Sequence, residues 1–212
     1  MLSKIVLAVG VTMCACTATF GFDPIKVDLA NDEAGKPLLT QPPTAGPVIS
    51  RPANIVAGSS IKVENVEQFK GKAIVLKDAS CMNFCFMLSS GKYLFHFEYL
   101  GMKSAGNSFF GVKNSKSEGI MTLMFTNDQT DIYVITDANT RYNAVLTKDT
   151  PAAFDVIIDL DAWTFSVDVN GKIMANGPLA NKEKSLCYVE FSSLAGNNFA
   201  IKDFSMSKLE NK

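Results

Sequence analysis

Short runs of alternating apolar and polar residues fill most of the chain after about residue 70. In "KYLFHFEYL", residues 92–100, aromatic residues occupy every second position, so they share one face of a strand: Tyr93, Phe95, Phe97 and Tyr99. A face with four aromatic side chains belongs in a core, which places His96 and Glu98 on the outward face. This period of two predicts β-strands rather than helices.

Such runs recur, separated by Gly, Ser, Asn and Asp, at residues 72–78, 83–88, 92–100, 108–114, 120–126, 131–136, 141–146, 154–160, 164–169, 185–193 and 198–206. No stretch has a helical period. Many short strands joined by frequent turns predict an all-β fold, an antiparallel two-sheet sandwich or jelly roll, with a closed single-sheet barrel as the alternative. The sequence Asn170-Gly171 predicts a type I′ hairpin turn.

Proline marks the boundary of the folded domain. Five of the 8 prolines fall within residues 37–52, and proline removes a ladder donor and fixes φ. We therefore interpret residues 19–53 as an extended, proline-rich arm and residues 54–212 as one domain. A chain of 212 residues, 47% of them hydrophobic, suits a single β-rich domain.

The N-terminus has the pattern of a secretory signal peptide. Lys4 precedes an uncharged apolar run from Ile5 to about Cys16. Small residues lie near its end, at Ala15 and Ala18. Residues 1–18 are interpreted as the signal, which predicts an exported protein: secreted, periplasmic or on the cell surface. The string "MCAC" also resembles a bacterial lipobox, in which the signal ends at residue 15 and Cys16 is lipidated. Both alternatives stay open.

The charge balance argues against a nucleic acid partner. The chain has 20 basic and 21 acidic residues, without a cluster of Lys or Arg. Binding to nucleic acid depends on neutralising phosphates with a basic patch. A membrane is expected as a partner only through a lipid on Cys16.

Three cysteines follow the signal: Cys81, Cys85 and Cys187. In an oxidising compartment the simplest arrangement is one disulfide from Cys187 to either of the others, with one thiol left free. Together with His96 they match the ligand count of a Cys3His zinc site. On one strand, however, Cys81 and Cys85 would lie about 13 Å apart, too far for one ion. We expect no metal and no cofactor.

Candidate ligand-binding residues lie at two turns. Trp163, with Asp161 in "LDAWT", connects two predicted strands, and an exposed tryptophan there would form a platform for a sugar ring. The alternative is a hydrophobic plug over the sandwich edge. Tyr133, Arg141 and Tyr142 flank a polar loop and are the next candidates.

An enzymatic alternative uses two glutamates. In "LCYVEFSS", residues 186–193, alternation places Cys187 inside and Glu190 outside. If Glu190 and Glu98 shared one concave sheet, they would make the carboxylate pair of a glycoside hydrolase, at a separation of about 5 to 9.5 Å, with His96 tuning Glu98. The simpler interpretation is that outward glutamates are solvated.

The last part of the chain resembles the concanavalin A-like lectin/glucanase superfamily, including laminin G-like domains. The resemblance rests on a strand that ends in Asp, a following strand that ends in "VNG", a later "VEFSS" and a closing "IKDFSM". It implies a two-sheet jelly roll and, by analogy, a glycan or other extracellular surface ligand. The E-x-D-x-x-E string of the glucanases and the Gln-Ile-His motif of the alginate lyases are absent. The sequence thus favours an exported, non-catalytic binding domain over a hydrolase or a purely structural envelope module.

Overall fold

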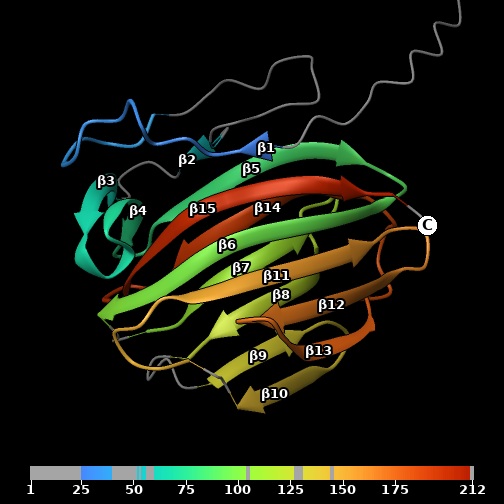
Figure 1. Cartoon of the computed structure of the whole chain (residues 1–212). Coiled ribbons are helices and arrows are strands. Elements are labelled where there is room, and N and C mark those ends of the chain that lie inside the picture. Colours follow the sequence, from blue (N-terminus) through green and yellow to red (C-terminus); the bar gives the residue numbers. More distant parts are fainter. Residues whose placement is uncertain are drawn as a thin grey trace, which may run out of the picture.

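Two antiparallel sheets pack face to face in the computed structural model (Figure 1), which confirms the predicted all-β sandwich. The structure describes residues 25–39, 52, 54–55, 60–103, 106–126, 131–143 and 146–210. The predicted signal peptide and Cys16 lie outside these residues. In the described part the one helical element is a 3-10 turn, η1 (Glu67–Phe69), and no helix has the length and hydropathy needed to cross a bilayer.

The larger sheet has eight strands. Its order is β13 (Lys172–Pro178), β12 (Thr164–Val169), β11 (Ala152–Asp159), β6 (Lys92–Lys103), β15 (Asn198–Leu209), β4 (Gly71–Lys77) and β3 (Ser60–Val66), and β1 (Ile25–Lys26) pairs with β15. The second sheet has seven strands, in the order β10 (Asn139–Asn143), β9 (Asp131–Ile135), β8 (Gly119–Phe125), β7 (Ser108–Lys113), β14 (Leu186–Ser193), β5 (Cys81–Leu88) and β2 (Asn54–Ile55).

The core lies between the sheets, and most of its largest fully buried side chains are phenylalanines. The predicted inward positions of β6 and β11 are buried. Phe97 stacks on Phe154 with 5.2 Å between ring centroids, and it meets Phe191 of the opposite sheet edge-on, also at 5.2 Å. The Tyr99 hydroxyl is hydrogen-bonded to that of Ser108 at 2.8 Å, and the Tyr93 hydroxyl donates to the Ser90 carbonyl at 2.9 Å, so both polar groups of this aromatic face have partners. Every second residue of these strands consequently points to an outer face.

The β12–β13 hairpin turns as predicted. Asn170 and Gly171 have φ values of 53° and 80°, the two positive angles that a type I′ turn requires. The Asn170 side chain also accepts a hydrogen bond from the Ala153 amide of β11 at 2.9 Å, which ties the turn to the neighbouring strand.

Residues 25–39, assigned from the sequence to the arm, lie against the eight-stranded sheet (Figure 1). Ile25 of β1 pairs with Met206, and Val27 and Leu38 are buried in the core cluster. Pro37 forms an isolated bridge with Lys62 of β3. This part of the proline-rich segment therefore contributes packing and a short strand to the domain.

Alternation fails at one place in β14. The prediction that Cys187 points inward is wrong, because Leu186 occupies the buried position and Cys187 is partly exposed. The register of β14 on β5 shifts between Leu186 and Tyr188, so two residues of β5 face one residue of β14. Such a bulge reverses the in-and-out pattern of the strand on one side.

Candidate functional site

The two glutamates of the hydrolase alternative lie on opposite outer faces. Glu98 is on β6 of the eight-stranded sheet, and Glu190 is on β14 of the seven-stranded sheet. Their inward neighbours Phe97 and Phe191 pack against each other, so the core separates the two carboxylates. Packed sheets are about 10 Å apart before the outward side chains are counted. The carboxylate pair expected for glycoside hydrolysis is not formed.

His96 contacts an aspartate instead of tuning Glu98. Its Nδ1 lies 2.7 Å from Oδ1 of Asp155, its register partner on β11. Ser205 of β15 is the register partner of His96 on the other side, yet the described contacts of His96 include no bond to it. The three cysteines that, with His96, match the ligand count of a zinc site lie on the other sheet, so His96 does not join them.

Trp163 is a buried plug, and the prediction of an exposed sugar platform is wrong. Its side chain is only 9% exposed, and the indole Nε1 donates a hydrogen bond to the Ala180 carbonyl at 2.9 Å. The residue sits in the left-handed region with φ of 57°, which turns the ring over the edge of the sandwich. The indole N–H thus has the partner that burial requires.

Asp161 stabilises the turn between β11 and β12, in which Trp163 lies. Its Oδ1 accepts a hydrogen bond from the Gly91 amide at 3.0 Å, which joins the β11–β12 turn to the β5–β6 turn. Asp159 accepts from the amides of Asp161 and Ala162 at 3.1 and 2.8 Å, as in an Asx-turn. Both carboxylates are used for local structure.

Tyr133 and Arg141 form a pair on the outer face of the seven-stranded sheet. They are register partners on β9 and β10, and the Arg141 guanidinium carbon lies 6.0 Å from the Tyr133 ring centroid. Arg141 is also ion-paired with Asp131. Tyr142, the third predicted residue of this group, packs against the core and does not share their face.

Further along the same face, a polar centre surrounds a glycine. Glu190 is the register partner of Gly111 on β7, which in turn pairs with Thr122 on β8. Lys113 Nζ lies 3.6 Å from Glu190 Oε1, and Ser192 donates to the same oxygen at 3.2 Å. Gly111 itself is buried, and the Lys113 side chain lies over it, since a Cβ at Gly111 would meet Lys113 Cε at 3.3 Å.

Aromatic side chains flank this centre. A row of register partners runs from Ser192 through Phe109 and Met124 to Tyr133 and Arg141. On the other side, Tyr188 is the register partner of Lys113. We call the outer face of the seven-stranded sheet the polar–aromatic face and define it by Phe109, Gly111, Lys113, Thr122, Tyr133, Arg141, Tyr188 and Glu190. Sequence reasoning found Tyr133 and Arg141 as candidates but missed Phe109, Gly111 and Lys113, although alternation already places Phe109 and Lys113 on the outward side of their strand.

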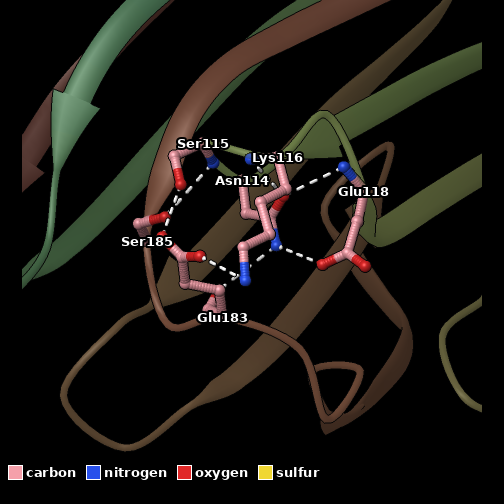
Figure 2. Close-up of polar contacts among 6 residues, drawn as sticks. All are labelled: Asn114, Ser115, Lys116, Glu118, Glu183 and Ser185. Atoms are coloured by element: carbon pink, nitrogen blue, oxygen red, sulfur yellow. Dashed lines mark hydrogen bonds and ion pairs between the residues drawn. The ribbon is translucent and has the colours of Figure 1, made fainter.

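A second polar cluster joins two loops beside this sheet (Figure 2). Asn114 is fully buried, and its side-chain oxygen accepts from the amides of Lys116 and Glu118 at 3.0 and 2.9 Å. Glu183 accepts a hydrogen bond from Ser115 and lies 3.1 Å from Lys116 Nζ. The hydrogen bond from Ser115, with help from Lys116, lowers the pKa of Glu183. The cluster fixes the loop after β13 to the β7–β8 turn.

The eight-stranded sheet has a hollow of about 330 Å³ under the N-terminal segment. It lies between residues 26–30 and the side chains of Lys72, Lys202 and Asp203. Lys72 Nζ donates to the carbonyl oxygens of Leu29 and Ala30 at 3.4 and 2.9 Å, and Lys202 Nζ donates to the Phe69 carbonyl at 3.3 Å. Lys72 thus ties the segment to β4, whereas Lys202 ties β15 to the end of η1.

Solved structures share this fold at low sequence identity. A sialidase superposes with a TM-score of 0.62 and 10% identity over 74% of this chain, and the match spans 17% of the sialidase. A Bacillus subtilis protein of unknown function with a galectin-like fold has a TM-score of 0.54, 11% identity and coverage of 74% and 90% of the two chains. The potassium-bound carbohydrate recognition domain of Emp46p superposes with a TM-score of 0.52 and 11% identity, and the match covers 72% of this chain and 87% of that domain. No family profile and no curated protein sequence matches the chain.

These likenesses confirm the fold that the sequence resemblance implied. The chain shares the two-sheet sandwich fold of these proteins.

Proposed function

We propose that the protein is an exported, non-catalytic domain that binds neutral, hydroxyl-rich glycans on the polar–aromatic face. The observation that carries the proposal is the arrangement of Phe109, Tyr133 and Tyr188 around the Glu190–Lys113 pair.

The chemistry of this face suits a sugar ring. A pyranose presents an apolar C–H face, which packs on an aromatic ring, and an edge of hydroxyl groups, which need both donors and acceptors. Glu190 supplies acceptors, Lys113 supplies donors and Thr122 supplies either. Glu190 and Lys113 are four-fifths and about three-quarters buried, so their orientation is fixed before a ligand arrives.

Charge pairing favours a neutral ligand over an acidic one. The two cations of the face are already matched, Lys113 with Glu190 and Arg141 with Asp131. An anionic sugar would have to compete with these carboxylates. The carbohydrate recognition domain of Emp46p, which has the same fold, supports a glycan as the ligand class.

Export is supported by the N-terminal sequence from Lys4 to Ala18. The mass of the intact protein isolated from its native source tests this part. A mature chain that begins at Thr19, or at a lipidated Cys16, agrees with export, whereas a chain that retains residues 1–15 contradicts it.

Binding is tested with a matched pair of substitutions. Glu190→Gln and Glu98→Gln make the same change on central strands of the two sheets, on opposite outer faces. On an array of neutral and acidic glycans we expect binding to neutral glycans that Glu190→Gln reduces at least tenfold and Glu98→Gln leaves unchanged. Equal loss in both variants, or no glycan bound by the wild type, would contradict the proposal.

A further inference from the structure

The three described cysteines lie on two neighbouring strands of the seven-stranded sheet. Cys81 and Cys85 are on β5, and Cys187 is on the adjacent β14. All three are partly exposed.

The bulge brings one of these cysteines next to Cys187. Tyr188 is the register partner of Cys85, so Cys187 is one residue from the position directly opposite Cys85. With about 4.8 Å between strands and 3.3 Å per residue, the two Cα atoms are about 6 Å apart, within the usual disulfide range. Leu186 and Val189 are buried while Cys187 and Tyr188 are not, so Cys187 has left the core side of its strand.

The pKa of Cys85 is also affected by Cys187. After burial, charge repulsion from Cys187 is the second cause that raises the pKa of Cys85. A negative charge on a neighbouring thiolate disfavours ionisation of the second thiol.

Cys81 is excluded as a partner for either thiol. Its register partner is Ser192, five residues from Cys187, which corresponds to about 16 Å along β14. Along β5 it is about 13 Å from Cys85. Burial and the adjacent Glu190 carboxylate raise the pKa of Cys81 to about 12, so its reactive thiolate is scarce at neutral pH.

We propose that Cys85 and Cys187 form a disulfide that joins β5 to β14 across the bulge, with Cys81 left as an unreactive thiol. The bond forms by exchange with a disulfide donor such as oxidised glutathione. One cysteine thiolate attacks the donor and releases one glutathione thiol, and the second thiolate then attacks the mixed disulfide and releases the other. The two cysteines lose two protons and two electrons, and the donor is reduced to two thiols. This inference is independent of the glycan proposal.

Peptide mapping tests the pairing in the full chain. After incubation with oxidised glutathione and blocking with iodoacetamide, a tryptic digest without reductant should contain residues 78–92 linked to residues 185–202. Cys81→Ser should retain this linked species and Cys85→Ser should lose it. The two substitutions are matched, since both remove a partly exposed thiol from the same strand. A linkage that survives Cys85→Ser would overturn the proposal.

A second measurement needs no variant. Wild-type protein is labelled with iodoacetamide after oxidation, then unfolded, reduced and labelled with N-ethylmaleimide, and fragment spectra locate each label. We expect N-ethylmaleimide on Cys85 and Cys187 but not on Cys81. Iodoacetamide found on both Cys85 and Cys187 would also overturn the proposal.

Discussion

At the scale of single residues, Gly111 decides how much room the polar–aromatic face offers. A Cβ built at this position would meet Lys113 Cε at 3.3 Å, Thr122 Oγ1 at 3.7 Å and Glu190 Cβ at 4.0 Å. The side chain nearest to it is the flexible end of a lysine, so the sheet itself need not move. A glycine in the middle of a strand is otherwise unfavourable, and here it leaves the space in which the Lys113 side chain lies against the sheet.

The substitution Gly111→Ala separates binding from stability. The added methyl group would displace the Lys113 side chain from Glu190. Alanine also loses less backbone entropy than glycine when the strand forms. We expect glycan affinity to fall about tenfold, equivalent to about 1.4 kcal/mol, with a melting temperature that does not decrease. Isothermal titration and thermal unfolding check this. Unchanged affinity would show that Gly111 is not part of the ligand surface.

Trp163 illustrates the opposite case, a candidate binding residue that belongs to the scaffold. Because its ring is buried and its N–H is bonded to Ala180, Trp163→Ala should lower the free energy of unfolding by about 3–5 kcal/mol. Trp163→Phe keeps most of the packing and should cost about 1 kcal/mol for the lost indole hydrogen bond, because the Ala180 carbonyl still accepts from the Lys182 amide at 2.8 Å.

Urea unfolding measures both effects. Glycan affinity of the folded Trp163→Phe protein should equal that of the wild type. A variant with wild-type stability and lost glycan binding would restore the platform interpretation.

At the scale of elements, the strands were predictable because each carries its own alternation. The runs at 92–100, 154–160 and 164–169 correspond to β6, β11 and β12, and their inward residues are the buried ones. β3 and β13 were missed, since "SIKVENV" and "KIMANGP" carry few aromatic residues and the latter contains Asn-Gly-Pro. The orientation of Cys187 was wrong because a bulge depends on the partner strand, which alternation along one strand does not reveal.

The β5–β14 disulfide should stabilise the sandwich. It would close a loop of about 100 residues, for which the chain-entropy treatment gives roughly 4–5 kcal/mol. A domain of this size changes its melting temperature by about 2–4 °C per kcal/mol. Reduction of the oxidised protein should therefore lower the melting temperature by about 10 °C. The variant Cys85→Ser should show no such response to reductant, and a response that persists in it would point to another bond.

The contacts of Glu183 with Ser115 and Lys116, drawn in Figure 2, should weaken in acid. The pKa of Glu183 is lowered in the folded protein by Ser115 and Lys116, so its contacts contribute above the ordinary glutamate value of 4.5 and are lost as the pH falls through the lower folded value. We expect faster exchange of the amides around Ser115 and Ser185 below about pH 4. In Glu183→Gln the exchange of these amides, corrected for the intrinsic pH effect, should not depend on pH in this range.

At the scale of the whole molecule, the two sheets present different surfaces. In the eight-stranded sheet, residues 25–39 pair with the edges of β15 and β3, and the outward His96 is engaged by Asp155. The outer face of the seven-stranded sheet combines aromatic side chains with a matched ion pair beside Gly111. The sequence alone indicated which residues point outward, but not which sheet each strand joins. For this reason Glu98 and Glu190 looked like partners although the core lies between them.

Hydrogen exchange upon addition of a neutral glycan tests the claim that the ligand binds on the polar–aromatic face, because it reports on both sheets in one experiment. The claim predicts added protection in β7, β8 and β14, centred on residues 109–113 and 188–192, with no change in β6 and β11. Protection confined to β6, β11 or the segment 25–39 would contradict it and place the ligand on the opposite face.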